Sequence, residues 1–510
     1  MTQTPHIATP APVTEKEIRS VYFALMAVLG LGALDQSIVA TALPRIVTDL
    51  GGMAHLSWVV TAYVLASTAT MPLYGKMADQ YGRRPMIFTA LATFLLGSVL
   101  CGLAGSMTQL IVFRAIQGMG AGGFMPLAQI IISDLVAPQD RAKRQGSIAI
   151  VFAVTSVLGP VLGGVMTDLL SWHWIFFINL PVAALCVFGA SSLLRSSETP
   201  TQKLKVDTVG LSLMVFWIAS LQIMLDIGRE HDWFGDARIV ALAIAAGIGF
   251  LVFLAWEVTE KNPIVDLKVF RHRGFTVAVA SLSFAFATFF ASAVIIPQWL
   301  QTSMGYTATY AGYATAFTGV AAVIMSPIVA KLSTKYDPRA LVCFGILWMG
   351  MTSLLRVHWN SGADFWTLAF PQLLQGVGMP FFFIPLTTLA LGAVEPQETA
   401  AAAGVMSFLR TMAGAIGTSI SATMWDNSGR AARSEIVSTM NTQATSDALA
   451  AQGFSLDQIR TVIAQLVDKE AMAVATTHIF LISAVVFAFA AMIIWLTPRP
   501  TRAVAMGAAH

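Results

Sequence analysis

The chain has 510 residues, of which 56% are hydrophobic and only 11% are charged, and its mean hydropathy is +0.71. This composition lies far outside that of soluble globular domains and predicts a polytopic membrane protein. The formal net charge of +3 argues against nucleic acid as a partner.

Apolar stretches repeatedly reach the roughly 20 residues with which a helix crosses about 30 Å of hydrocarbon, which is too long for barrel strands. The expected fold is therefore all-α, with fourteen transmembrane helices. The predicted spans are 18–43, 57–76, 85–104, 108–132, 145–167, 172–194, 206–227, 237–257, 274–301, 307–331, 339–357, 364–393, 401–426 and 474–497. No small-residue cleavage site follows the first apolar run, so it is interpreted as a retained span.

The positive charges favour one orientation in the membrane. If both termini are cytoplasmic, 20 of the 30 Lys and Arg residues lie in cytoplasmic segments and only eight lie on the opposite side. The other two, Arg114 and Arg410, lie inside spans. The positive-inside rule therefore predicts cytoplasmic termini, in agreement with an even number of spans.

The first span contains Asp35, in the stretch LGALDQSIVATALP, among side chains that suit hydrocarbon. An ionisable side chain inside a transmembrane segment is costly and indicates a functional site by default. Asp35 is therefore the first candidate site residue.

The loop after the second span, GKMADQYGRRP (75–85), combines Gly75, Asp79, Gly82, Arg83 and Arg84. Its glycines permit a tight turn, and its arginines hold the turn on the cytoplasmic side. Topology alone would require only the positive charges. A carboxylate at this boundary can bind a cation or a helix N-terminus, so the loop is a candidate conformational latch.

Arg114 lies deep in the fourth span, where a cation costs about 2.5–3.5 kcal/mol on insertion scales. Gln117 and Gly118 follow at helical spacing and share its face, where a small residue permits close helix contact. Arg114 is thus a second functional candidate. The alternative is a structural anchor that binds backbone carbonyls.

The fifth span contains GPVLGG, with Gly159, Pro160, Gly163 and Gly164. Small residues set helix contacts in membranes, so the motif is explained by a packing notch. It is equally explained by a notch that bends as two parts of the protein move. The motif alone leaves both interpretations open.

Two pairs of motifs indicate an internal repeat. GKMADQYGRRP matches AKLSTKYDPRA (330–340), and RAIQGMG (114–120) matches PQLLQGVG (371–378), at nearly the same offset. The repeat relates six spans to six spans and leaves two inserted spans between them. The predicted segments are a cytoplasmic tail (1–17), a first six-helix bundle (18–194), an insert with its flanking loops (195–273), a second bundle (274–497) and a cytoplasmic tail (498–510).

The second bundle contains two further features. Arg410 lies near the middle of the thirteenth span, where it is explained by function or by structural pairing. Residues 427–473 form a polar extracytoplasmic loop, in which Ser455 and Gln458 have capping-box spacing and begin a short amphipathic helix. This helix projects from the membrane or lies along its surface; the alternative is a solvated helical hairpin.

No catalytic or metal-binding pattern accompanies these features. The sequence lacks HExxH, GxSxG, phosphate-loop and His/Cys-cluster motifs, and its three cysteines show no paired spacing. A membrane-embedded enzyme is therefore not expected, and neither a cofactor nor a metal site is predicted.

Together the motifs resemble those of the drug:proton antiporters of the major facilitator superfamily, specifically its fourteen-span branch. LDQSIVATALP resembles the first-span signature of that branch, GKMADQYGRRP the loop between the second and third spans, RAIQGMGAG the fourth-span motif and GPVLGG the antiporter motif. SLQIMLDIGREHDWF, NPIVDLKVF, GYTATYAG, PLTTLALG and TMAGAIGTSISATMW are similar to multidrug exporters of the EmrB type. The position that matches Asp79 in the second half is Thr334, so a symmetric latch is not expected.

The resemblance implies the major facilitator fold and proton-driven export of amphipathic or hydrophobic drugs from the bacterial inner membrane. Asp35 would be the proton-coupling carboxylate, Arg114 its partner in proton exchange, and Asp79 with Arg83 and Arg84 the latch. A periplasmic adaptor of the EmrA kind and a TolC-like outer-membrane channel are also implied. The alternative on the same scaffold is a narrow exporter of one metabolite, siderophore or antibiotic.

Overall fold

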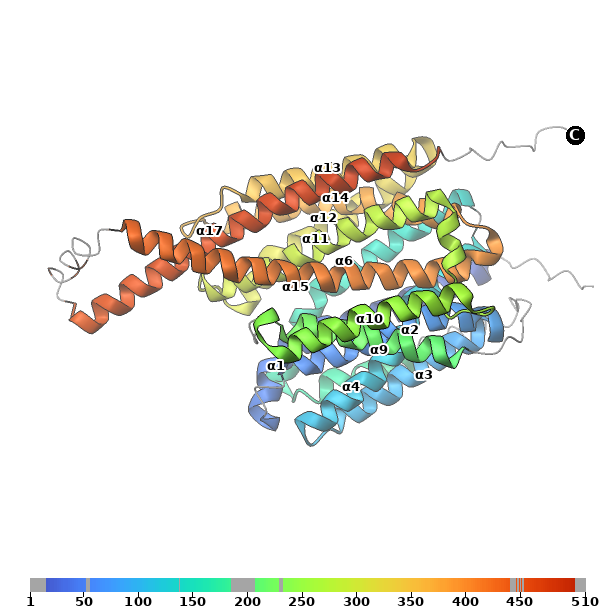
Figure 1. The fold of residues 1–510 in the computed structure, drawn as a ribbon, viewed down its shortest axis with the longest axis horizontal. Helices are drawn as coiled ribbons and strands as arrows, with labels where there is room; N and C mark the ends of the chain where they lie inside the picture. The colour runs from blue at the N-terminus through green and yellow to red at the C-terminus, as the bar shows by residue number, and fades with distance from the viewer. Residues whose placement is uncertain are drawn as a thin grey trace, which may run out of the picture.

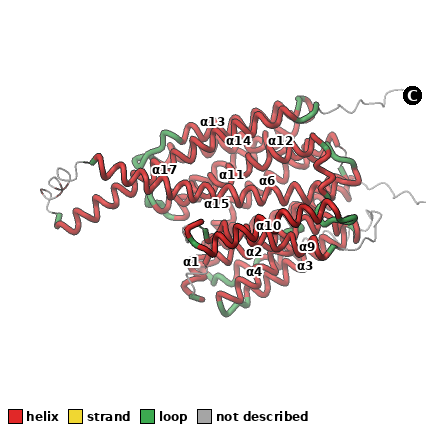
Figure 2. The backbone as a smooth tube through the Cα atoms, viewed as in Figure 1, coloured by secondary structure: helices red, strands yellow, loops and turns green. Residues whose placement is uncertain are grey.

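The computed structural model describes residues 15–51, 56–136, 138–184, 207–228, 233–440 and 454–499, together with positions 446, 449 and 451. Every regular element in these residues is a helix (Figure 2), which confirms the all-α prediction. Residues 1–14 and 500–510, most of both predicted tails, lie outside the described residues.

The helices follow the predicted spans closely in chain order. Their bounds are α1 (Glu15–Leu50), α2 (Leu56–Tyr81), α3 (Arg83–Gly102), α4 (Met107–Ala121), α5 (Phe124–Leu135), α6 (Pro138–Leu169), α7 (Trp174–Phe177), α9 (Thr208–Ile227), α10 (Ala237–Thr259), α11 (Arg273–Thr302), α12 (Ala308–Lys335), α13 (Pro338–Arg356), α14 (Phe365–Gly392), α15 (Thr399–Thr439) and α17 (Leu456–Ile493). Four short 3-10 helices are η2 (Trp233–Gly235), η3 (Leu267–Arg271), η4 (Pro396–Glu398) and η5 (Ile494–Leu496).

Eleven of the described helical segments are long and apolar enough to cross a membrane. The predicted spans 57–76 and 145–167 are covered by α2 and α6, which are long helices but are not among the eleven. The predicted span 172–194 is described only to residue 184, and it contains the shorter apolar helix Trp174–Ala184. Fourteen spans and cytoplasmic termini therefore stay predictions.

The predicted fourth span, 108–132, is divided into α4 and α5 at Gly122 and Gly123. A Cβ atom added at Gly122 would collide with the Thr70 hydroxyl and the Ser67 carbonyl oxygen of α2. The absence of a side chain at Gly122 therefore lets α2 pass close to the joint.

The helices form two groups (Figure 1). In the first, α1 packs on α6, and α4 packs on α2 and α3; in the second, α14 packs on α12 and α13, and α15 packs on α11 and α17. The groups meet where α6 packs on α12 and where α15 packs on α2 and α5. We call the end with the turn Tyr81–Arg83 the proximal end, and the end from which α15 and α17 project the distal end.

The two groups are in close contact near the proximal end. A Cβ atom added at Gly75 of α2 would lie 2.9 Å from the carbonyl oxygen of Ala400 and 3.3 Å from the Cα of Gly404, both on α15. One added at Gly146 of α6 would lie 3.3 Å from the carbonyl oxygen of Ser326 on α12. Contacts this short leave no passage for a solute between these helix pairs at this end.

The inserted helices α9 and α10 lie against the junction of the two groups. Trp217 of α9 meets Phe408 of α15 edge to face at 6.0 Å, and the Ser419 hydroxyl of α15 donates to the Leu225 carbonyl at 2.8 Å. Lys76 of α2 donates to the carbonyl of Asn262 at 2.5 Å, just after α10. The insert therefore contacts both groups.

Among its described residues the region 427–473 is largely helical, which agrees with the solvated helical hairpin considered for it. Helix α15 continues to Thr439 and α17 begins at Leu456, so the two project as a pair that an Arg433–Asp468 ion pair joins at 3.2 Å. The capping box of Ser455 and Gln458 is confirmed. The short helix predicted there is the first part of α17, which runs on without a break into the bundle.

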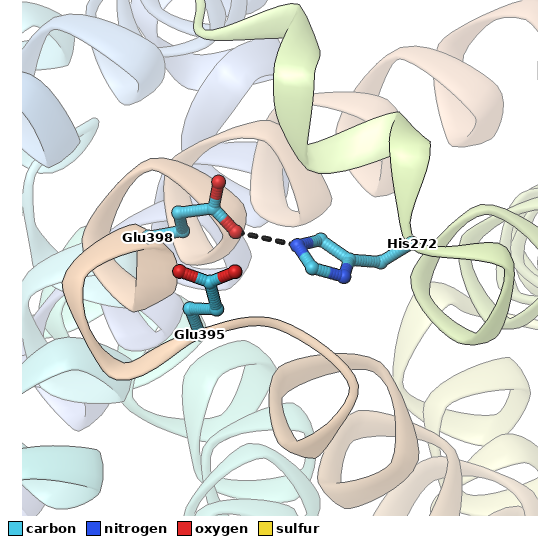
Figure 3. A group of neighbouring side chains, drawn as sticks. All are labelled: His272, Glu395 and Glu398. Atoms are coloured by element: carbon cyan, nitrogen blue, oxygen red, sulfur yellow. Dashed lines mark hydrogen bonds and ion pairs between the residues drawn. The ribbon is translucent and has the colours of Figure 1, made fainter.

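The proximal end also contains a charged cluster (Figure 3). His272 Nε2 lies 2.6 Å from Glu398 Oε2, and Arg271 forms ion pairs with Glu395 at 3.0 Å and Glu398 at 2.9 Å. His272 and the two carboxylates lie close enough together to hold a metal ion. Because Arg271 already binds both carboxylates, we interpret the cluster as an ionic tie between the start of α11 and η4.

Candidate functional site

Asp35 of α1 and Arg114 of α4 form an ion pair inside the first group of helices. Arg114 Nη1 lies 2.7 Å from Asp35 Oδ2, and the two side chains are 1% and 0% exposed. Neither charge contacts lipid or bulk water, because the surrounding helices cover both. The two ionisable residues that the sequence predicted as partners are therefore in direct contact.

Three neutral side chains complete a network around Asp35. Gln117 Nε2 and Asn179 Nδ2 donate to Asp35 Oδ1 at 2.8 and 2.9 Å. Both amides also donate to the Ser98 hydroxyl, at 3.2 and 2.8 Å, and Ser98 donates to the Phe176 carbonyl at 2.9 Å. The carboxylate thus accepts three hydrogen bonds, which compensate in part for its loss of water.

Arg114 has partners besides Asp35. Its Nε donates to the Val59 carbonyl at 3.2 Å and its Nη1 donates to Gln117 Oε1 at 2.6 Å. Its guanidinium lies 4.1 Å from the centre of the Tyr63 ring, a favourable position for a cation. The backbone anchor considered above therefore exists together with the ion pair.

Gly118 explains how α2 comes so close to Arg114. A Cβ atom at Gly118 would collide with the Tyr63 carbonyl oxygen and lie 3.0 Å from the Tyr63 Cα. Only glycine permits this approach, which brings the Tyr63 ring and the Val59 carbonyl to Arg114. Gln117 and Gly118 therefore act at one site, the first as a partner and the second as a spacer.

The network can respond to a proton at Asp35. Protonation would neutralise the carboxyl group and leave Arg114 as a buried cation without a counter-charge. Removing one partner of a buried ion pair typically costs about 3–5 kcal/mol. The protonated protein is therefore driven towards a rearrangement in which water or another group reaches Arg114.

The candidate latch lies at the proximal end. Arg83 Nη1 is 2.7 Å from Asp79 Oδ1, and Arg83 Nε is 3.0 Å from Asp134 Oδ2 of α5. Gly82 has a φ of 90°, a backbone conformation that favours glycine. Arg84 lies 5.9 Å from the centre of the Phe88 ring.

Burial raises the pKa of the Asp79 carboxyl above its ordinary value, and the nearby Arg83 charge opposes this effect. Asp79 therefore binds a proton at a higher pH than a fully hydrated aspartate does. Protonation would remove its ion pair with Arg83. With Gly75 packed on α15, the loop combines a breakable charge contact with a contact between the two helix groups.

The glycines of the antiporter motif differ in their surroundings. A Cβ atom at Gly159 would collide with the Ser37 hydroxyl of α1, whereas one at Gly164 would meet no atom within 4 Å. Gly163 is buried, and the side chain of Pro160 lies outside the described residues. Gly159 is therefore a packing notch against the helix of Asp35, while Gly164 is not needed for a close contact.

The second group contains a buried arginine that the sequence analysis missed. Arg356, at the end of the predicted span 339–357, is one of the eight positive charges counted on the extracytoplasmic side, but it is 0% exposed. Its Nη2 donates to Gln372 Oε1 at 2.9 Å and also to Gln375, the repeat counterpart of Gln117. Its Nε and Nη1 have no hydrogen-bond partner in the structure, so Arg356 lacks the counter-charge that Arg114 has.

Arg410, the third arginine within the spans, lies on α15 and is half-buried. Its guanidinium is 5.6 Å from the centre of the Phe286 ring. The structural pairing considered for it is not found among the described residues, where it has neither an ion pair nor a hydrogen bond.

Sequence reasoning also missed Asn179, Ser98 and Tyr63. Asn179 is the one with a visible signal, because it is an amide within the apolar run WIFFINLPV. Ser98 and Tyr63 are ordinary residues for a transmembrane helix, so only the packing of α2 and α3 against α4 reveals them.

Comparisons with known proteins agree with this geometry. The sequence profile of the Major Facilitator Superfamily matches residues 25–418. The chain is 36% identical over 474 residues to the multidrug export protein EmrB of Escherichia coli (strain K12), covering 92% of this chain and 93% of the relative. It is 34% identical over 473 residues to the fatty acid resistance protein FarB of Neisseria gonorrhoeae, covering 92% and 93%.

A solved structure with a similar fold is that of the human organic anion transporter MFSD10. The TM-score is 0.61 and the sequence identity 15%, and the match covers 93% of this chain and 100% of the other. At this identity the likeness concerns the fold alone. The resemblance to exporters of the EmrB type is confirmed by the sequence relatives.

Proposed function

This chain belongs to the major facilitator superfamily, and we propose that it is a proton-coupled multidrug efflux transporter of the bacterial inner membrane. As a member of this family it is a multi-pass membrane transporter and not an enzyme. Its cargo would be amphipathic or hydrophobic toxic compounds, which it would export by alternating access. The observation that best supports proton coupling is the buried Asp35–Arg114 pair.

The proposed cycle begins in the conformation described above, with the proximal, cytoplasmic end closed and Asp35 ionised. A proton from the distal side neutralises Asp35, and the unpaired Arg114 favours the rearrangement that opens the cytoplasmic end. The proton leaves there and substrate binds. Each elementary charge that crosses the membrane gains about 2.3 kcal/mol per 100 mV, so the gradient can drive substrate export.

This function is tested in proteoliposomes that contain the purified protein alone. With an imposed pH gradient, wild type should accumulate a labelled hydrophobic drug against its concentration gradient, and a protonophore should abolish the accumulation. Drug movement that ignores the gradient would contradict proton coupling. The same assay is repeated with a panel of unrelated compounds. Transport of several of them indicates multidrug export, and transport of one indicates narrow specificity.

A periplasmic adaptor of the EmrA kind and a TolC-like channel belong to the proposal because the resemblance to exporters of the EmrB type implies them. The projecting part of α15 and α17 offers the adaptor a surface beyond the bundle (Figure 1). Accumulation in the same proteoliposomes would mean that the adaptor is not needed for crossing the inner membrane. Failure there, with rescue by a co-reconstituted adaptor, would make it obligatory.

The Asp79–Arg83–Asp134 contacts would stabilise the state that is closed at the proximal end. In Arg83→Gln both ion pairs are lost, and at these partly exposed positions each is worth at most about 1 kcal/mol. We therefore expect the open population to increase by up to about thirtyfold. Ser326 is buried where α12 contacts α6 at the proximal end, so a cysteine there is accessible only when that end opens. In a background without native cysteines, maleimide labelling of Ser326→Cys should be faster by the same factor when Arg83→Gln is present.

Arg45→Gln is a matched control for this experiment, because it removes an exposed arginine that pairs with Asp49 at 3.8 Å outside the latch. It should leave the labelling rate unchanged. Equal labelling in Arg83→Gln and Arg45→Gln would remove the latch from the mechanism.

A further inference from the structure

Arg410 is a cation at the centre of the protein whose charge nothing in the described chain compensates. Arg114 has Asp35, and Arg356 donates to glutamine side chains, whereas Arg410 has no ion pair or hydrogen bond among the described residues and lies over the face of Phe286. A cation inside a membrane span costs about 2.5–3.5 kcal/mol on insertion scales. Such a charge is expected to serve a group that is bound only part of the time.

Arg410 lines a small cavity between the two helix groups. Gln129 of α5 contributes from the first group; the lining from the second group consists of Leu282, Phe383, Thr387, Met406, Ser407 and Arg410. Ser407 is 1% exposed and its hydroxyl has no hydrogen-bond partner. A guanidinium and an unsatisfied hydroxyl therefore face the same space, and together they can donate to one anionic group.

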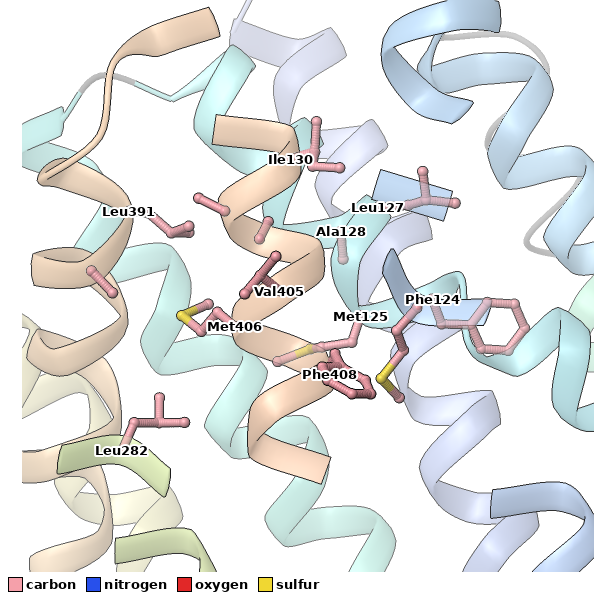
Figure 4. Packing of buried hydrophobic residues seen from close by; sticks show 14 of the residues in the cluster. Phe124, Met125, Leu127, Ala128, Ile130, Leu282, Leu391, Val405, Met406 and Phe408 are labelled. Atoms are coloured by element: carbon pink, nitrogen blue, oxygen red, sulfur yellow. The ribbon is translucent and has the colours of Figure 1, made fainter. Parts of the chain in front are cut away.

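An apolar surface begins directly beside this polar pair. The Phe286 ring lies 5.3 Å from Phe382, 5.7 Å from Phe290 and 5.9 Å from Phe383, centre to centre. Figure 4 shows Met406 and Phe408 on α15, between α5 and the helices of the second group. Aromatic rings and methionines can adapt their packing to apolar groups of different shape.

We propose that Arg410 and Ser407 bind the anionic head group of acidic amphipathic substrates, whose apolar part packs on the Phe286 cluster. A guanidinium binds a carboxylate through two parallel hydrogen bonds, and the Ser407 hydroxyl supplies a third donor. This inference rests on the proposed export function and names its preferred substrate class.

The site is closed in the present conformation and opens as the groups separate. In this conformation the space holds neither a water molecule nor a drug-sized ligand. Gln129 belongs to the first group, so movement of α5 away from α15 would widen the cavity. Binding is thereby linked to the same motion that alternating access requires.

The charge also determines which substrates are disfavoured. A cation placed beside Arg410 meets a like charge, whereas an anion neutralises it. An exported anion moves with the inside-negative potential, which favours its export by about 2.3 kcal/mol per 100 mV. Acidic amphipaths are therefore selected by the site and driven by the membrane potential.

The test is a binding measurement that needs no gradient. Decanoate, decanol and decyltrimethylammonium are equilibrated at pH 8 with the protein in nanodiscs, with empty nanodiscs as the blank. Wild type should bind decanoate at least about tenfold more tightly than either of the other two. Arg410→Gln should weaken decanoate at least about tenfold and leave decanol unchanged, while Arg410→Lys should retain part of the affinity.

Two further variants keep the test decisive. Ser407→Ala should weaken decanoate severalfold even if Arg410→Gln does not fold, and Arg238→Gln, which removes an arginine that is 80% exposed, should not. Equal affinity for decanoate and decanol in wild type, or no change in the folded Arg410 and Ser407 variants, would overturn the proposal. If decanoate binding depends on Arg410 but the protein shows no gradient-driven transport, the proposed export function is contradicted. The binding site at Arg410 is then still supported.

Discussion

Asp35→Asn is expected to abolish gradient-driven accumulation of drug in proteoliposomes, by at least a factor of ten, while the protein remains folded. Asparagine has the shape of the protonated aspartate, so it can represent that state but cannot release the proton. In the proposed cycle substrate binds only after the proton has left, so the variant stays in the state that does not carry substrate. A folded variant without accumulation therefore separates loss of coupling from loss of structure.

The variant should also be less stable, because Arg114 loses its counter-charge. We expect a lower melting temperature with a monodisperse gel-filtration profile, since the asparagine oxygen can still accept from Arg114. Asp49→Asn is the matched control: it lies on the same helix, is 42% exposed and pairs with Arg45. If Asp35→Asn accumulates drug as well as Asp49→Asn does, Asp35 is not the coupling carboxylate.

The contact between Asp35 and Arg114 could be expected from the sequence for an energetic reason. Each is costly alone inside a membrane, and a pair is the cheapest way to hold both. Gln117 could be placed as well, since it lies at i+3 from Arg114 on one helix. The other partners of Asp35 come from different helices, and helical periodicity carries no information about which distant residues meet.

The same limit explains the error at Arg356. It lies at the end of its helix, where an arginine usually reaches water, and a count of positive charges places it outside. Burial comes instead from Gln372 and Gln375 of the next helix, with the rings of Trp359 and Phe480 at 5.8 and 5.5 Å from the guanidinium. Only the tertiary fold shows that this end is covered.

The sequence left the polar region 427–473 open between a loop with a short helix and a helical hairpin, because hydropathy detects membrane depth rather than helicity. Both α15 and α17 leave the apolar zone without ending, and their projecting parts are polar because they face water. The capping box was a reliable local signal, since it depends on residues three positions apart. The local motif thus located the start of α17. That the helix continues without a break into the bundle is seen only in the tertiary fold.

Gly118→Ala is expected to destabilise the protein strongly, because the added methyl group meets the backbone of the neighbouring helix. The new methyl group would collide with the Tyr63 carbonyl oxygen and lie 3.0 Å from two further backbone atoms of Tyr63. The backbone atoms of Tyr63 cannot rotate away as a side chain can, so α2 must move away from α4. Overpacking of this kind costs about 1–3 kcal/mol, and this collision lies at the upper end.

The separation would also disturb the charged network, because α2 supplies the Val59 carbonyl and the Tyr63 ring that contact Arg114. Gly118→Ala should therefore lower both the melting temperature in detergent and the gradient-driven transport of the molecules that remain folded. Gly247→Ala on α10 is the matched control, since its added methyl group meets no atom within 4 Å and alanine favours the helix. If the two variants melt at the same temperature, the close approach of α2 to α4 does not hold the Arg114 site together.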